Sequence, residues 1–210
     1  MIAVVIPAFD EQDTIGPIVS EFYKYGEGVD MTVYVDIDPE TTDHTVKRAI
    51  RAGAAILRSQ EHGKGQVVNH AMRILHYLPE IVFCDADVSI SSGAVAELLL
   101  PLGRHTGQRI VIPRYPTATE WDEATTTAGL QFNPDAWGIV SGIRRVRREC
   151  IPDGLYGYLM ETQINKAVAE AGYTTERAYS HDTISPLRFT PRRVADLLAH
   201  GKYGKENGIL

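Results

Sequence analysis

The fold of this chain is constrained most by a series of short apolar runs, each followed by a segment whose apolar residues have helical spacing. Continuous apolar runs of this length are typical of parallel strands buried on both faces. Because short connections join runs and helical segments, the sequence predicts a single α/β domain with a mostly parallel sheet flanked by helices. The runs are residues 2–6, 31–35, 54–57, 81–84 and 110–112, and the helical segments begin near residues 14, 43, 64 and 92.

The second half of the chain has weaker periodicity. Residues 138–141 and 174–179 are predicted strands, and residues 159–171 and 190–200 are predicted helices. Residues 114–137 contain two prolines and three consecutive threonines, and we assign them no element. The end of the chain from residue 201 is expected to be mobile. All 210 residues are expected to form one domain.

Composition limits the classes of protein to consider. Hydrophobic residues make up 44% and charged residues 23%, which is ordinary for a soluble globular protein. We find neither an apolar run long enough to cross a membrane nor a signal peptide. The two cysteines are Cys84, in an apolar run, and Cys150, and Cys84 is expected to be packed rather than bridged. We therefore expect a cytoplasmic protein.

Charge is distributed unevenly along the chain. Residues 1–137 carry 10 Lys and Arg against 19 Asp and Glu, whereas residues 138–210 carry 11 against 8. These net charges of −9 and +3 agree with −6 for the whole chain. The basic half has arginine pairs at 144–145, 147–148 and 192–193. They indicate either solvated helix faces or an anionic acceptor or phosphate that approaches this half.

Polar residues gather where the predicted strands end. In an open parallel sheet, ligands bind beyond the carboxyl ends of the strands. Segments 7–11, 36–38, 58–64 and 85–87 all follow such ends, so they are expected to converge on one edge of the sheet. This placement predicts one binding site, independently of any family likeness.

Asp85 and Asp87 form a D-x-D motif directly after a buried strand. Two carboxylates at this position can share a hard cation that holds the phosphates of a nucleotide. Asp87 is expected to be the stronger metal ligand, because it lies further into the loop. Asp85 is expected to orient a ribose or the water shell of the metal. The alternative for the pair is helix capping or a surface turn.

Other residues suit a nucleotide by chemical type. Asp36 or Asp38 can accept hydrogen bonds from a ribose or a base. The N–H groups of Gly63 and Gly65, at a helix N-terminus, suit a phosphate, and Lys64 adds a positive charge. The alternative for this segment is an ordinary helix-entry turn.

His181 and Glu161 are candidates from the second half. His181 follows a predicted strand and is a reasonable third ligand for Mn²⁺, although a lone His is usually structural. Glu161 lies in the first turn of a predicted helix, where it can contact an acceptor or stabilise positive charge on a sugar. Its alternative role is a favourable interaction with the helix dipole.

Four segments of the first half together resemble the nucleotide-sugar glycosyltransferases of the GT-A fold, and most closely the family-2-type enzymes. Residues 5–11 (VIPAFDE) resemble their first strand and loop, and residues 42–45 (TDHT) resemble their S-T-D-x-T segment. The G-K-G of residues 63–65 and the D-A-D of residues 85–87 complete the likeness. It covers residues 1–115, which it implies are the half that binds the nucleotide sugar.

The second half resembles glucosyl-3-phosphoglycerate synthases and their mannosyl relatives. Residues 141–148 (SGIRRVRR) are similar to their S-G-x-x-x-x-R-R stretch, and residues 155–161 (LYGYLME) to their G-Y-G-V-E segment. His181 falls where that group has a metal-binding His. The resemblance makes residues 116–200 the acceptor-binding half.

The resemblance implies a metal-dependent transfer of a hexose from a UDP- or GDP-sugar to an acceptor hydroxyl, with retention and with Mg²⁺ or Mn²⁺. Glu161 and Asp87 would be catalytic, and Asp85, Asp87 and His181 would hold the metal. The implied donor contacts are Pro7, Ala8, Phe9, Glu11, Asp36, Asp38, Arg58, Gly63, Lys64, Asp85 and Ala86. The implied acceptor contacts are Arg114, Ser141, Gly142, Arg144, Tyr156 and Gly157.

Two other functions remain open at this stage. A nucleotidyltransferase can share such a sheet, but it usually has a basic Gly-rich loop after its first strand, and residues 7–11 are acidic instead. A non-catalytic nucleotide-sugar binder is the other alternative. The acceptor is open among a phosphorylated small molecule, a lipid phosphate and a modified DNA base, and so is a homodimer.

Overall fold

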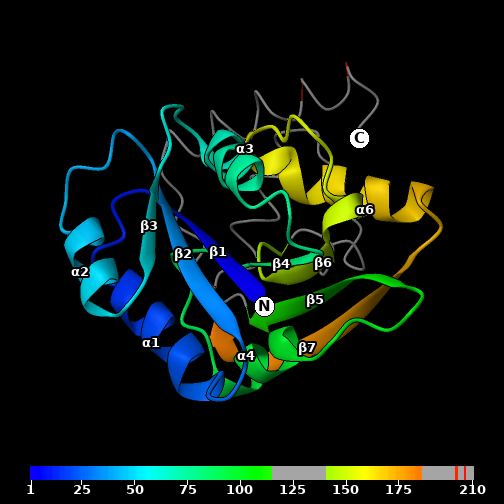
Figure 1. The fold of residues 1–210 in the computed structure, drawn as a ribbon, viewed down its shortest axis with the longest axis horizontal. Helices are drawn as coiled ribbons and strands as arrows, with labels where there is room; N and C mark the ends of the chain where they lie inside the picture. Colours follow the sequence, from blue (N-terminus) through cyan, green and yellow to red (C-terminus); the bar gives the residue numbers. More distant parts are fainter. Residues whose placement is uncertain (115–140, 186–201, 203–205, 207–210) are drawn as a thin grey trace.

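The central feature of the fold is a seven-stranded sheet in the order β3-β2-β1-β4-β6-β5-β7 (Figure 1). The computed structural model describes residues 1–114, 141–185, 202 and 206. Within this part of the chain only β6 runs against its neighbours, and the other strands are parallel to one another. Their carboxyl ends therefore share one edge. The strands are β1 (Ile2–Ala8), β2 (Met31–Ile37), β3 (Ala55–Arg58), β4 (Glu80–Phe83), β5 (Thr106–Arg114), β6 (Arg144–Arg147) and β7 (Thr174–Ile184).

Helices cover both faces of the sheet (Figure 1). One core layer contains α1, α2 and α4, and the other contains α3 and α6. Alternate residues of β1 serve the two layers, since Val4 and Ile6 pack in the first and Ala3 and Val5 in the second. The helices are α1 (Ile15–Tyr25), α2 (Thr45–Arg51), α3 (Lys64–Ile74), α4 (Ser92–Leu99) and α6 (Met160–Glu170), with short 3₁₀ turns η2 (Arg148–Cys150) and η3 (Gly157–Leu159).

The first half of the fold confirms the predicted alternation of strands and helices. The strand predicted at residues 138–141 is wrong where it can be checked, because Ser141 lies in a loop and the next strand is β6. β5 and β7 are longer than predicted. The predicted helix at residues 190–200 and the mobile tail lie outside the described residues, apart from Lys202 and Glu206.

The arginines of β6 have structural roles. Arg145 pairs with Glu80 and donates to the carbonyl oxygens of Leu98, Leu99 and Leu100, at the C-terminus of α4. The Arg147 guanidinium donates to the carbonyl oxygen of Gly103, in the loop before β5, and to that of Thr106, at the start of β5. Neither prediction for this arginine stretch holds at Arg145, which is neither on a solvated helix face nor at the carboxyl edge.

Two further observations bear on the sequence predictions. Cys84 and Cys150 are both buried and free, as expected for Cys84. Within the described ranges, no helix has the length and apolar character needed to cross a bilayer.

Candidate functional site

The loops after β1 and β2 are joined at the carboxyl edge of the sheet. The Asp10 carboxylate accepts a hydrogen bond from the Thr42 N–H at 2.8 Å, and the Asp43 carboxylate accepts one from the Gln12 N–H at 3.0 Å. The Thr45 hydroxyl accepts from the Glu11 N–H at 2.7 Å. Asp10 has φ +50°, in the left-handed region that few non-glycine residues adopt. These contacts explain the T-D-x-T spacing, because Asp43 and Thr45 fix the loop that carries Phe9 and Glu11.

Asp38 connects the end of β2 to the start of α3. Its buried carboxylate accepts from the Gly63 N–H at 2.9 Å and contacts His62 Nδ1 at 2.8 Å. Gly63 has φ +107°, a conformation that favours glycine, and directly precedes α3. Asp38 was predicted to accept from a ribose or base, and its carboxylate is instead engaged with the chain itself. His62 and Gly63 are the groups that it positions at the edge.

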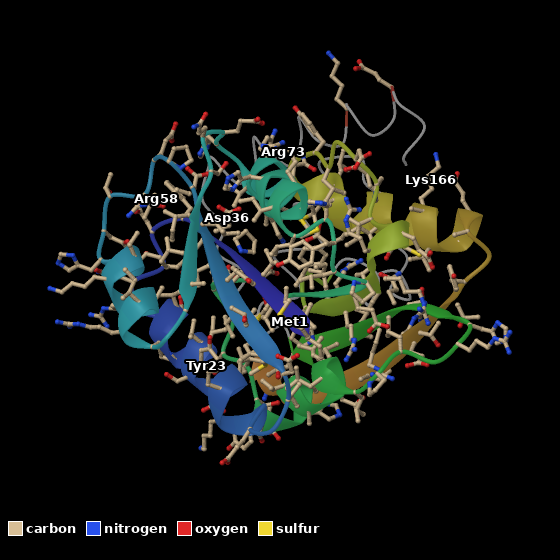
Figure 2. All side chains as sticks on the ribbon, viewed as in Figure 1. Met1, Tyr23, Asp36, Arg58, Arg73 and Lys166 are labelled. Carbon is tan, nitrogen blue, oxygen red and sulfur yellow. The ribbon has the colours of Figure 1, made fainter. Side chains whose placement is uncertain are left out.

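Asp36 lies near the end of β2 on the side of α3 (Figure 2) and is fully buried. One carboxylate oxygen lies 2.8 Å from His70 Nδ1 of α3, and the other has no hydrogen-bond partner in the described structure. Burial raises the pKa of Asp36, and the contact with His70 offsets part of that rise. The predicted contact between Asp36 and a ribose or base does not fit a side chain with no exposed surface.

Lys64 joins the two halves of the chain. Its Nζ lies 2.6 Å from an oxygen of Asp85, after β4, and 2.6 Å from an oxygen of Glu161, in the first turn of α6. Burial alone would lower the pKa of Lys64, but the two adjacent carboxylates outweigh burial and raise it. Lys64 is therefore charged at physiological pH. The Lys64 side chain keeps 18% of its surface exposed and the Glu161 side chain keeps 4%, so Lys64 is the more exposed of the two side chains.

Helix α3 also holds the segment that precedes α6. The Asn69 side chain donates to the Leu155 carbonyl at 2.7 Å and accepts from the Leu155 N–H at 2.9 Å. Gly65 packs against the backbone, since a Cβ there would lie 2.7 Å from the Tyr156 carbonyl carbon. The G-K-G segment thus supports Tyr156 and Gly157, which were predicted to contact the acceptor.

The start of β6 lies against the D-x-D motif. Gly142 is in direct contact with the Asp85 carboxylate, and a Cβ at Gly142 would overlap it. The Ser141 hydroxyl donates to the Val111 carbonyl and accepts from the Ile143 N–H. Arg144 is fully buried, and its guanidinium donates to Gln108, Asn165 and the Glu161 carbonyl. A fully buried guanidinium does not fit the predicted acceptor contact, so Arg144 supports the Glu161 backbone instead.

The predicted metal ligands are less close together than expected. Asp87 is half-buried beyond Asp85, and His181 is exposed in β7. His181 lies where the pairing of β7 with β5 shifts register, between Ser180 and Ile184. Ile184 forms a bridge to Ser89, after the D-x-D motif. Among residues 1–114 and 141–185, no three His, Cys, Asp or Glu side chains converge to hold a metal. The set of Asp85, Asp87 and His181 therefore does not form a three-ligand site in this structure.

An aspartate pair still fits one kind of cation site. Mg²⁺ is commonly bound through one or two carboxylates, with water and substrate phosphates as its other ligands. Asp87 and Asp85 are hard oxygen donors at the edge where the loops converge, so they suit such a cation.

The remaining predicted residues occupy the same edge with different exposure. Arg58 is exposed at the margin of the sheet (Figure 2), and Arg114 is exposed at the end of β5. Pro7, Glu11 and Tyr156 are half-buried, and Ala8 and Ala86 are buried. The sequence interpretation missed His62, Asn69 and His70. The one sequence signal for these residues was their position relative to α3. Asn69 and His70 lie beside the apolar face that Val68 and Ala71 define, and His62 lies just before the helix.

Comparisons with known proteins show which proteins this chain is similar to in sequence and in fold. No family model matches the chain. A similar curated protein is the glycosyltransferase AglJ of Haloferax volcanii, with 25% identity over 203 residues, covering 91% of this chain and 63% of AglJ. The chain thus spans less than two thirds of the length of this relative.

Two solved structures with a similar fold are those of mycobacterial proteins. Glucosyl-3-phosphoglycerate synthase of M. tuberculosis, in complex with Mn²⁺, UDP-glucose and phosphoglyceric acid, has a TM-score of 0.74 and 20% identity. That match covers 100% of this chain and 79% of the synthase. A further mycobacterial protein has a TM-score of 0.70 at 22% identity, covering 94% of this chain and 71% of its own. The chain thus has the GT-A fold and resembles nucleotide-sugar glycosyltransferases in sequence and structure.

Proposed function

We propose that this chain is a metal-dependent glycosyltransferase that moves a hexose from a UDP-sugar to an acceptor hydroxyl, with retention of configuration. The observation that carries the proposal is the position of Lys64, a buried cation between Asp85 and Glu161 at the carboxyl edge of the sheet. The fold shared with the M. tuberculosis synthase, whose complex holds Mn²⁺ and UDP-glucose, supports the choice of donor.

Lys64 would stabilise the leaving group. When the bond between sugar and diphosphate breaks, negative charge builds up on the departing diphosphate, and a fixed ammonium beside it lowers the barrier. The carboxylates of Asp85 and Glu161 hold the ammonium in place. A divalent cation, when bound by Asp87, would neutralise further charge on the diphosphate.

Glu161 would lie beside Lys64, on the side of the sugar or the acceptor. Its carboxylate is almost fully buried and is fixed by Lys64, while Arg144 fixes its backbone carbonyl. A carboxylate held this rigidly can stabilise positive charge on the sugar ring as it develops. For the acceptor we propose a phosphorylated small molecule, with the exposed Arg114 at the end of β5 as a cation within this edge.

The proposal is tested by replacing Lys64 and measuring release of UDP from UDP-glucose with Mg²⁺ or Mn²⁺, in the presence and absence of 3-phosphoglycerate. Lys64→Met is expected to lower kcat/KM by about 10²- to 10³-fold, the range for removing one preorganised electrostatic contact. Lys64→Arg keeps the charge, and Lys24→Met removes an exposed lysine on α1 as a matched control. Wild-type rates in a folded Lys64→Met variant would refute the assignment.

A further inference from the structure

We propose that the rings of Phe9 and His62 form the wall that receives the nucleobase of the donor, and that His62 is a binding residue for that base. This inference rests on the proposed function, because it assumes that a nucleoside diphosphate occupies the carboxyl edge of the sheet. Neither the sequence motifs nor the comparisons assign a role to His62.

The two rings come from different loops and meet at right angles. Their centroids are 5.8 Å apart and their planes are 76° from each other. Phe9 directly follows β1, and His62 lies between β3 and α3. Two rings in this arrangement form a corner, in which a planar base can stack on one ring and meet the other with its edge.

Both rings are partly open to solvent. Phe9 is 38% exposed, and the His62 side chain is 39% exposed. Leaving a phenylalanine half in water loses part of the free energy that burial would provide. A phenylalanine at the ligand-binding edge of the sheet therefore has apolar surface to offer to a flat ligand.

The His62 ring is held in place before any ligand arrives. Its Nδ1 lies 2.8 Å from the buried Asp38 carboxylate, which also accepts the Gly63 N–H. A carboxylate on Nδ1 orients an imidazole and fixes its tautomer. Asp38 thus contributes to base recognition through His62 rather than by direct contact.

The position of His62 relative to Lys64 fits a nucleoside diphosphate. One residue, Gly63, lies between them, so their Cα atoms are at most about 7 Å apart. Lys64 is the cation proposed for the diphosphate. A nucleotide with its phosphates at Lys64 would then extend its base towards the ring pair, along the edge between β1 and α3.

The experiment compares binding of UDP and of inorganic pyrophosphate, each with Mg²⁺, by calorimetry and by competition. Loss of one base–ring contact is expected to weaken UDP binding by about 5- to 100-fold in His62→Ala. His62→Phe, which keeps a flat ring but loses the contact with Asp38, is expected to bind UDP more tightly than His62→Ala and less tightly than wild type. Pyrophosphate, which has no base, should bind all variants equally, and His76→Ala, at an exposed histidine beyond α3, should match wild type.

Several results would overturn the inference. One is UDP binding by folded His62→Ala within twofold of wild type. Another is an equal loss for UDP and pyrophosphate, because His62 would then act on the phosphate site or on the loop as a whole. Equal losses in His62→Phe and His62→Ala would also exclude ring stacking. If wild type binds neither UDP nor pyrophosphate, the proposed function fails as well, which distinguishes that failure from the others.

Discussion

The close approach of α3 to the segment before α6 leads to a prediction about Gly65. A Cβ at Gly65 would lie 2.7 Å from the Tyr156 carbonyl carbon and 2.9 Å from the Leu155 carbonyl oxygen. Both are backbone atoms, and Asn69 pins that backbone with two hydrogen bonds. The segment cannot move aside cheaply, so Gly65→Ala should separate α3 from it and disturb the site around Lys64.

The expected change in the free energy of unfolding of Gly65→Ala follows from two opposing effects. Alanine in place of glycine stabilises a helix by about 1 kcal/mol or less. Overpacking a tight contact costs about 1–3 kcal/mol. We therefore expect Gly65→Ala to lower the free energy of unfolding by about 1–2 kcal/mol, which lowers Tm by about 2–8 °C for a chain of this length.

Gly93 provides a matched control. It is the second residue of α4, as Gly65 is of α3, and a Cβ there would meet only the Ser91 hydroxyl oxygen, at 3.9 Å. Gly93→Ala should therefore raise the free energy of unfolding by up to about 1 kcal/mol. Urea unfolding of both variants measures the difference, and hydrogen exchange at residues 154–157 should rise in Gly65→Ala alone.

A double-mutant cycle tests the reason for the cost. Asn69→Ala releases the segment, so Gly65→Ala should cost less in that background, with a coupling of about 0.5–2 kcal/mol. If Gly65→Ala proves as stable as Gly93→Ala, the close packing of α3 on residues 155–157 is wrong.

Three other variants test separate parts of the structure. Asn69→Ala alone should lower the free energy of unfolding by about 1–3 kcal/mol, because two backbone groups of Leu155 lose their hydrogen-bond partners. An unchanged free energy in urea unfolding would contradict these two hydrogen bonds. Arg145→Met should lower the free energy of unfolding by about 3–5 kcal/mol, because the C-terminus of α4 loses its cap and Glu80 loses its shorter ion pair, keeping the one with Arg147 at 3.9 Å. Arg104→Met, at an exposed arginine, should cost nothing measurable in the same assay. Asp36→Asn tests the buried carboxyl: because its folded pKa is raised, wild type should lose stability relative to the variant as pH rises from about 3.8 through that folded value. A difference between wild type and Asp36→Asn that stays flat from pH 4 to 7 would contradict the raised pKa.

The sequence predicted the first half of the fold because its strands are continuous apolar runs. Val4 and Val82 lie in two such runs, which end at Pro7 and at Asp85, and both of these residues mark the binding edge. β6 escaped prediction because its sequence, RRVR, has no apolar run. Its two buried arginines are paired inside the fold: Arg145 with Glu80 and carbonyl groups at the C-terminus of α4, and Arg144 with Gln108 and Asn165. Tertiary contacts of this kind override local pattern.

The sequence likewise predicted some features of the candidate site and not others. The placement of Lys64 and Asp85 at one edge followed from the strand ends, whereas Glu161 was a candidate only from its place in the first turn of a helix and from the family resemblance. Buried partners did not follow from the sequence, since nothing in it indicates that Asp36 bonds His70 or that Asp38 bonds His62. These pairs depend on how α3 lies against β2, which only the folded structure specifies.

Cleavage of the donor tests the central claim most directly. Wild-type protein incubated with UDP-glucose, Mg²⁺ and 3-phosphoglycerate can be followed by ³¹P NMR, which separates UDP from pyrophosphate. We expect UDP to accumulate with wild type and not with Asp87→Ala. Release of pyrophosphate, or UDP formation that is unchanged in Asp87→Ala, would contradict a metal-dependent glycosyl transfer at this edge of the sheet.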